Sequence, residues 1–375
     1  MLTAYQLDVL IDPILDLYAR YEQTVIEDIA RRLAGMSFSS AAWQVQRLNA
    51  SGLIYKQVLK RLAQLTGQSE STLRAIFKRA GVKTMTFDDS VYAAAGLRPM
   101  PMNLSPAMAR VLAEGVRKTA GLFNNLTLST AIAAQEAYFR AADLAYMQVS
   151  SGSMSYDQAI KQAIQSVASD GLTTIRYPSG HRDHLDVAIR RTVLTGVGQT
   201  ALQLQSVRAD EMAQDLVQVS AHIGARNKGE GPENHESWQG KIYSRSGNNS
   251  RYPNFVEVTG YGTGEGLGGW NCRHSFYPYF EGLSESAYTA EDLKNFAAET
   301  VKYNGKEMSV YDATQTQRAI ERKIRFWKRQ AGALEAGGIG SEAEAAKVKQ
   351  WQAVMRDFIR QTGLSRQYVR ERVLY

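Results

Sequence analysis

Residues of the types that bind metals or attack substrates gather in one segment of this chain. Residues 219–279 contain the only cysteine, three of the five histidines and two of the five tryptophans. Thiolate sulfur and imidazole nitrogen are ligands that zinc prefers. The sequence therefore allows a zinc site made by His222, His235, Cys272 and His274, although no cofactor is required. The alternative is that these side chains hydrogen-bond the loop backbone and hold the turns in place. We expect no other cofactor.

The same residues also allow a second chemistry, in which Cys272 is a nucleophile and a histidine is its base. Glu230, Glu233 or Glu236 would orient that histidine, and Arg273 would lower the pKa of the neighbouring thiol in the right geometry. The segment has neither a protease signature nor a strand–turn–helix elbow. A hydrolase or nuclease-like enzyme is therefore the alternative hypothesis, not the main one.

The glycines at 264–269 match the spacing of a dinucleotide-binding loop, GxGxxG. Such a loop must open a helix, but Trp270 and Asn271 follow here, and the chain has no Gly-Lys-Ser/Thr phosphate loop. Glycine is also the residue that tolerates positive φ and close backbone approach. The pattern therefore predicts tight turns, with no nucleotide bound.

Positive charge is concentrated at the C-terminal end of the chain. Residues 301–375 contain 15 basic and 8 acidic residues, whereas residues 1–300 contain 29 of each. This imbalance favours an acidic partner, either nucleic acid or an acidic protein surface, and solvated helix faces are the alternative. The side chains predicted to make the contact are Arg322, Lys323, Arg325, Lys328 and Arg329.

The composition is typical of a soluble globular protein, with 44% hydrophobic and 22% charged residues among 375. No apolar run approaches the roughly 18 residues that span a bilayer, and the N-terminus lacks a basic signal region. A single cysteine cannot form an intrachain disulfide, which fits assembly in a reducing cytoplasm. We expect no membrane partner.

Hydrophobic spacing predicts an α+β fold that is mostly α-helical, with a small β-containing, loop-rich motif domain near residues 215–282. Four regions are expected: an N-terminal helical region (1–98), a long-helix region (99–214), the motif domain (215–284) and a basic C-terminal helical region (285–375). Glycines should end helices at Gly35, Gly67 and Gly81. The other expected helices are 105–122, 128–150, 155–169, 184–207, 312–332, 341–362 and 365–373, with a short one starting near 286–289.

Strands are expected around the chemically unusual residues. β-branched or alternating runs predict strands at 173–177, 216–222, 241–244 and 254–260, and Pro178–Gly180 reads as a turn. Aromatic side chains bury large areas and should form the core of the motif domain. These are Trp238, Tyr243, Tyr261, Trp270, Phe276, Tyr277, Tyr279 and Phe280.

Three blocks in this segment are long and composed of rare residues: VSAHIGAR, HESWQGKIYS and TGYGTGEGLGGWNCRHSFYPYFEG. They resemble the phage minor capsid protein 2 family, which is distantly related to the Mu F-like head-morphogenesis proteins. The resemblance covers about 217–282. The matching residues are His222, Arg226, His235, Trp238, Gly240, Gly262, Gly266, Gly269, Trp270, Asn271, Cys272, Arg273, His274 and Pro278.

The resemblance implies a low-copy structural protein of a tailed-phage head, assembled in the host bacterial cytoplasm and retained in the virion. Its expected partners are the portal protein, the major capsid protein or both, and the basic C-terminal helices add packaged DNA as a candidate partner. No catalytic role attaches to the matching residues, so an enzyme is not expected. Mu F-like proteins carry a second cysteine two residues after the first, where this chain has His274. Histidine and cysteine can replace one another as zinc ligands.

Overall fold

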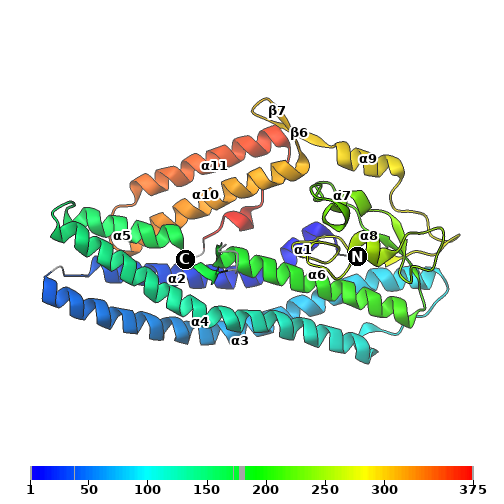
Figure 1. Ribbon diagram of the computed structural model, residues 1–375, viewed down its shortest axis with the longest axis horizontal. Coiled ribbons are helices and arrows are strands. Elements are labelled where there is room, and N and C mark those ends of the chain that lie inside the picture. The colour runs from blue at the N-terminus through cyan, green and yellow to red at the C-terminus, as the bar shows by residue number, and fades with distance from the viewer. Residues whose placement is uncertain (1, 38, 172, 177–181, 374–375) are drawn as a thin grey trace. The chain divides into compact units, whose positions relative to one another are not determined.

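The computed structural model describes residues 2–37, 39–171, 173–176 and 182–373. Within these ranges the protein is mostly helical with three small antiparallel sheets, which confirms the predicted α+β class (Figure 1). The α-helices are α1 (Ala4–Leu10), α2 (Asp12–Ala34), α3 (Ser40–Ala94), α4 (Pro106–Ser150), α5 (Tyr156–Asp170), α6 (Leu185–Glu211), α7 (His235–Trp238), α8 (Phe255–Thr259), α9 (Ala290–Ala298), α10 (Val310–Ala336) and α11 (Glu342–Thr362).

The strands are short and the remaining helical turns are of the 3-10 type. The strands are β1 (Thr173–Arg176), β2 (Arg182–His184), β3 (Leu216–Val219), β4 (Ile242–Ser244), β5 (Phe276–Pro278), β6 (Thr300–Tyr303) and β7 (Lys306–Ser309). The 3-10 turns are η1 (Met102–Leu104), η2 (Gly231–Glu233) and η3 (Tyr368–Glu371). The turn predicted at Pro178–Gly180 lies outside the described residues.

The chain forms two compact units, each built from three separate stretches of sequence. Unit 1 contains Met1–Asp12, Glu70–Ala120 and Arg191–Gln315, and unit 2 contains Pro13–Ser69, Gly121–Arg190 and Thr316–Tyr375. Every passage of the chain from one unit to the other falls inside a helix, namely α2, α3, α4, α6 and α10. The four-region division from the sequence stays a prediction.

Two predicted helix breaks are wrong, because α3 continues through Gly67 and Gly81. A glycine inside a helix costs about 1 kcal/mol relative to alanine. Burial of apolar side chains such as Leu65 and Leu73 offsets that cost on either side of Gly67. Similarly, α4 is one helix from Pro106 to Ser150, whereas the sequence predicted two. Long helices are therefore held by tertiary packing where local propensity is weak.

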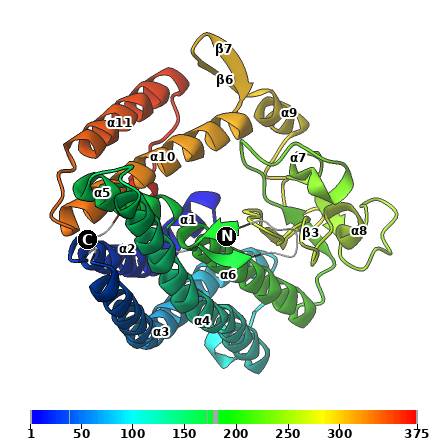
Figure 2. The ribbon, with the colours of Figure 1, turned by 60° about the vertical axis from the view of Figure 1, so that its left-hand side comes forward.

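Other helix ends follow their capping residues. The side chains of Ser155 and Thr289 accept hydrogen bonds from the backbone at the third helical positions of α5 and α9, and Gly35 directly follows α2. The C-terminal pair α10 and α11 forms an antiparallel hairpin, joined by the glycine-rich residues 337–340 (Figures 1 and 2). The helix predicted at 365–373 is wrong, because η3 is the only helical turn described there.

Unit 2 is a helical assembly joined by aromatic and ionic contacts. Tyr18 of α2 packs on Phe123 of α4 with ring centroids 5.1 Å apart, and Trp43 of α3 stacks on Tyr146 of α4 at 4.2 Å. The Arg47 guanidinium lies 2.6 Å from the carboxylate of Asp143. These contacts link helices that are far apart in sequence.

In unit 1, glycines let α3, α4 and α6 approach closely. A Cβ added to Gly115 would overlap Thr200 and lie 2.8 Å from Phe77, and a Cβ added to Gly196 would overlap Thr119. The side chains of Thr200, Phe77 and Thr119 occupy the space beside these two glycines, so a larger residue at either position would have to displace them. These helices support the sheet described next.

The motif region of unit 1 is organised on a three-stranded antiparallel sheet with order β4-β3-β5. Val217 in the central strand is paired with Tyr243 on one side and with Pro278 on the other. Strands β3 and β4 were predicted, whereas β5 was not. The strand predicted at 254–260 is wrong: the segment forms α8, because the Asn254 side chain caps the N–H groups of Val256 and Glu257.

A β-hairpin made by β6 and β7 was also missed. Its turn is Asn304–Gly305, with φ of 51° and 76°, the combination that two-residue hairpins favour. The Asn-Gly pair was a visible signal for it. Among the described residues, no helix is long and apolar enough to cross a membrane.

We expect Gly67→Ala to raise the free energy of unfolding by roughly 0.5–1 kcal/mol, because Gly67 is helical and a Cβ there meets nothing within 4 Å. Gly81→Ala is the matched control in the same helix. Its Cβ would lie 3.0 Å from Leu204 and 3.3 Å from Leu112, so the propensity gain should be lost. Urea denaturation of both variants measures the difference, and a loss of stability in Gly67→Ala would contradict the continuous helix.

Candidate functional site

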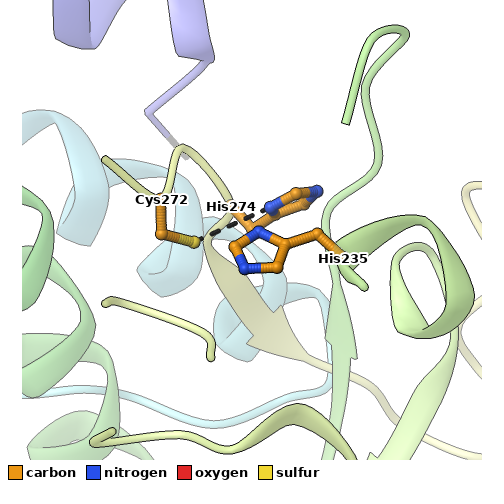
Figure 3. Close-up of side chains that lie close together, drawn as sticks. All are labelled: His235, Cys272 and His274. Atoms are coloured by element: carbon orange, nitrogen blue, oxygen red, sulfur yellow. Dashed lines mark hydrogen bonds between the residues drawn. The ribbon is translucent and has the colours of Figure 1, made fainter. Parts of the chain in front are cut away.

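Three of the four predicted metal ligands meet in the interior of unit 1 (Figure 3). His235 is the first residue of α7, and Cys272 and His274 lie in the turn before β5. One ligand atom from each residue lies within 4.8 Å of the other two, and all three side chains are buried. Residues 37 positions apart in sequence are therefore brought into one cluster.

The hydrogen bond of His235 determines its protonation. His235 Nε2 lies 2.7 Å from the carbonyl oxygen of Glu265. A carbonyl only accepts, so Nε2 carries the hydrogen and donates it. Burial lowers the pKa of His235 to about 4, so the ring is neutral at pH 7. Nδ1 therefore carries a lone pair.

His274 has the same arrangement. Its Nε2 lies 3.0 Å from Gln239 Oε1, and that oxygen also accepts the backbone N–H of His222 at 3.0 Å. Because Gln239 Oε1 accepts both bonds, the hydrogen of His274 is on Nε2. Burial, followed by the nearby His222 and His235, holds the pKa of His274 well below its usual range. Its Nδ1 lone pair is directed towards Cys272 Sγ, at 3.7 Å.

Cys272 is a buried thiol. Its side chain is 5% exposed, and burial raises the pKa of the thiol above its ordinary value. Reactive cysteines have the opposite character: they are accessible and their pKa is lowered. The neighbouring guanidinium of Arg273 is 3.0 Å from the carboxylate of Asp8. His274 Nδ1 faces the thiol as a base would, but the thiol is buried and its pKa is raised, so it lacks the accessibility and acidity of a Cys-His nucleophile.

His222 contacts the cluster in a different way. Its ring stacks on that of His274, with centroids 4.4 Å apart and planes 26° from parallel. Its Nδ1 lies 3.1 Å from the carbonyl oxygen of Ile223. The lone pair of an imidazole nitrogen lies in the plane of its ring. Because the His222 ring is stacked face to face on His274, its nitrogens do not point at a metal ion bound by His274. His222 is a packing partner in this conformation.

Trp238 packs against the cluster from the core side. Its ring centroid is 4.6 Å from that of His235 and 4.9 Å from that of His274, and its indole N–H donates to Pro232 O at 3.0 Å. Tyr243 donates to the Trp238 carbonyl oxygen at 2.7 Å. The predicted aromatic core is confirmed for Trp238, Tyr243 and Phe276, with Tyr261 packed against it.

Trp270 is a correction to that core, because its side chain is 58% exposed. The indole lies over the glycine loop instead: a Cβ added to Gly264 would be 2.9 Å from the Trp270 ring. Asn271 follows with a φ of 57°, in the left-handed region. The turn thus leaves the tryptophan outside and directs Cys272 inwards.

The glycines of the loop are required by close backbone packing. A Cβ on Gly266 would overlap the carbonyl oxygens of Thr259 and Gly260, and a Cβ on Gly269 would overlap that of Gly264. Gly240 and Gly262 have positive φ values of 73° and 91°. These four positions carry turn geometry, which the sequence predicted for Gly266 and Gly269.

Arg226, in the connection between β3 and α7, binds the glycine loop at residues 264–270. Its guanidinium donates to the carbonyl oxygen of Glu265 at 3.4 Å and to that of Trp270 at 3.2 Å. The sequence missed two other members of this network, Gln239 and the Glu265 carbonyl. Gln239 lies between Trp238 and Gly240, which match the motif, but a glutamine gives no sequence signal that it joins His222 to His274.

The five basic residues predicted for partner contact are in different environments. Arg329 is 7% exposed, and its guanidinium lies 3.7 Å from Glu22 within unit 2. Lys328 donates to the Glu371 carbonyl oxygen at 2.9 Å, and Arg325 donates to that of Arg370. Arg322 and Lys323 have exposed side chains. Of the five, Arg322 and Lys323 are therefore the two that lie on the surface.

A second buried titratable group lies behind β5. The Asp88 carboxyl is 1% exposed and accepts from Gln205 Nε2 at 3.0 Å, and Gln205 also donates to the Phe276 carbonyl oxygen. Burial raises the pKa of Asp88 to about 8. Gln205 Oε1 is buried without a hydrogen-bond partner.

Comparison with known proteins extends the similarity beyond the motif. The model of a family described as Phage minor capsid protein 2 matches residues 2–360. A protein named "Structural protein" from Lactococcus phage LL-H is 26% identical over 383 residues, which cover 95% of this chain and 97% of the relative. A second "Structural protein", from Lactococcus phage mv4, is 33% identical over 128 residues, covering 33% of this chain and 94% of the relative. No solved structure matches the chain.

We expect Asp88→Asn to stabilise the protein at pH 8 by at least about 1 kcal/mol and to have little effect near pH 4. A pKa raised in the folded state means that folding takes up a proton, so the stability contributed by Asp88 is present below its unfolded pKa and is lost as pH rises towards 8. Asparagine is neutral throughout, and its amide oxygen can still accept from Gln205 Nε2.

Asp89→Asn is the matched control, with the opposite expected sign. The Asp89 carboxylate lies 2.9 Å from Arg208, whose side chain is fully buried, so its loss should destabilise the protein at pH 8. Urea denaturation at pH 4 and pH 8 measures both variants. Equal destabilisation by the two substitutions at pH 8 would show that Asp88 is charged in the folded state.

Proposed function

Since the chain belongs to the Phage minor capsid protein 2 family, we propose that it is a low-copy structural component of a tailed-phage head. The observation that carries this proposal is the extent of the family match, residues 2–360, which includes sequence from both compact units. We propose further that the protein is held in the virion near the portal or the capsid interior, after assembly in the host cytoplasm.

The chemistry of the site supports a structural role rather than an enzymatic one. Burial raises the pKa of the Cys272 thiol, and His235 and His274 are buried beside it, so none of the three side chains is accessible to a substrate. An enzyme of the hydrolase or nuclease type would need an accessible nucleophile or base. The motif instead has the properties of a rigid module, with turns that exclude side chains and an aromatic core.

The copy number of the protein in purified particles tests the proposal. Quantitative mass spectrometry of particles from the source phage or induced prophage should find a few to a few tens of copies, scaling with the portal protein and not with the major capsid protein. A count that scales with the major capsid protein would contradict the low-copy role. Absence from finished particles would contradict a virion component altogether.

Packaged DNA or an acidic portal surface is the partner we propose for the C-terminal helices. The surplus of basic residues in 301–375 favours it, and Arg322 and Lys323 are the exposed members of the predicted contact set. Both lie on α10, one helical position apart, where they can approach the same stretch of a phosphate backbone. Contacts of this kind carry affinity without sequence preference.

We expect Arg322→Glu/Lys323→Glu to weaken DNA binding by the full-length chain and to make its log–log salt dependence shallower by about 2, because each lost phosphate contact removes about one released counterion. Lys78→Glu/Lys83→Glu on α3 is the charge-matched control, since both lysines are exposed and lie outside residues 301–375. Fluorescence anisotropy at several salt concentrations measures the slopes. Equal loss in both variants would assign the effect to net charge, and no binding by wild type at low salt would leave the acidic protein surface as the partner.

A further inference from the structure

Three donor side chains in the core of unit 1 converge on one point, and the proposed head function does not use them. We propose that His235, Cys272 and His274 bind a single zinc ion, which joins α7 to the turn before β5. This inference is independent of the location of the protein in the virion, because a head protein could fold with or without a metal.

The spacing of the donor atoms suits zinc. The three ligand atoms lie within 4.8 Å of one another, and Cys272 Sγ is 3.7 Å from His274 Nδ1. Tetrahedral zinc, with bonds of about 2.3 Å to sulfur and about 2.1 Å to nitrogen, places its ligand atoms about 3.4–3.7 Å apart. Closing the cluster around an ion therefore requires small side-chain adjustments.

The hydrogen bonds orient the lone pairs as a metal requires. Both histidines donate Nε2–H to an oxygen, Glu265 O for His235 and Gln239 Oε1 for His274, so Nδ1 is the unprotonated nitrogen in each ring. Histidine ligands of metals almost always donate their other N–H to an oxygen in this way. The outer shell of a zinc site is thus already in place.

The donor set selects the class of metal. One thiolate and two imidazoles suit zinc, whereas calcium and magnesium require oxygen ligands. His222 stacks on His274 and does not direct a nitrogen at the cluster, so the fourth position of the ion belongs to water. Binding replaces the S–H bond of Cys272 by a Zn–S bond, and the displaced proton goes to solvent.

The ion would also have a structural effect. His235 and Cys272 enclose the glycine loop, which contributes Glu265 O to one ligand and contacts Arg226 through the same carbonyl. These three donors are held together only in the folded chain, so zinc binds the folded state in preference to the unfolded one. Zinc that binds the folded state should therefore raise the melting temperature.

The test uses the full-length chain, stripped with a chelator and then titrated with zinc or with cobalt(II) as a spectroscopic probe. We expect wild type to retain stoichiometric zinc after dialysis, measured by inductively coupled plasma mass spectrometry. With cobalt(II) it should show a thiolate-to-metal charge-transfer band and the intense visible bands of tetrahedral coordination. Cys272→Ser and His274→Asn should lose stoichiometric binding and the charge-transfer band.

His222→Phe is the matched control, because phenylalanine preserves the stacking on His274 but cannot bind metal. It should retain zinc and the cobalt spectrum. Loss of zinc from His222→Phe equal to that from Cys272→Ser would overturn the three-residue ligand set. Wild type that is folded by circular dichroism yet binds no stoichiometric zinc, and gives no cobalt–thiolate band, would overturn the site itself, whatever the stability of the variants.

Discussion

The hydrogen bond from His235 to the carbonyl oxygen of Glu265 is the contact on which the motif region depends. A buried imidazole is tolerated only when it is neutral and its N–H is bonded. The acceptor here is a backbone atom whose position is set by the glycine loop, since Gly266 and Gly269 pack directly on neighbouring carbonyls. The turn geometry of the glycine loop therefore sets the tautomer of His235, and the same loop brings Cys272 close to that ring.

The same constraint explains why the unusual residues occur together in the sequence. Trp238 covers two of the imidazoles, Arg226 holds the loop carbonyls, and Gln239 joins His222 to His274. Each residue satisfies a polar group or fills a space that another one creates. Substituting one of these residues leaves a neighbouring buried group without its hydrogen-bond partner, or leaves a cavity. Either effect costs more free energy of folding than the lost contact alone.

Sequence reasoning found the motif because its residues are rare and their spacing is local, and it identified three of the clustered donors. It could not find Gln239, whose role arises only when the chain folds back on itself. The helix α8 was mistaken for a strand because Phe255 and Val256 have β propensity, whereas the Asn254 cap decides the outcome. Gly67 and Gly81 were mistaken for helix ends because burial along α3 is not visible in a short window.

Net charge identified only some of the basic side chains that lie on the surface. The surplus in residues 301–375 is a property of the sequence, but Arg329 is buried with Glu22, and Lys328 and Arg325 hold the backbone of the last segment. Some of these basic side chains stabilise the fold, and the others contribute positive charge to its surface. Arg322 and Lys323 are exposed because of the face of α10 on which they lie, and composition alone does not distinguish them from Arg325, Lys328 and Arg329.

The passage of five helices through both units has a genetic consequence. Each unit is a compact body, yet neither corresponds to a contiguous stretch of coding sequence. Exchange of one unit between related phages would require several crossovers, and a single crossover at any of these passages would join two halves of a helix from different parents. The two units are therefore expected to be inherited, and to vary, together.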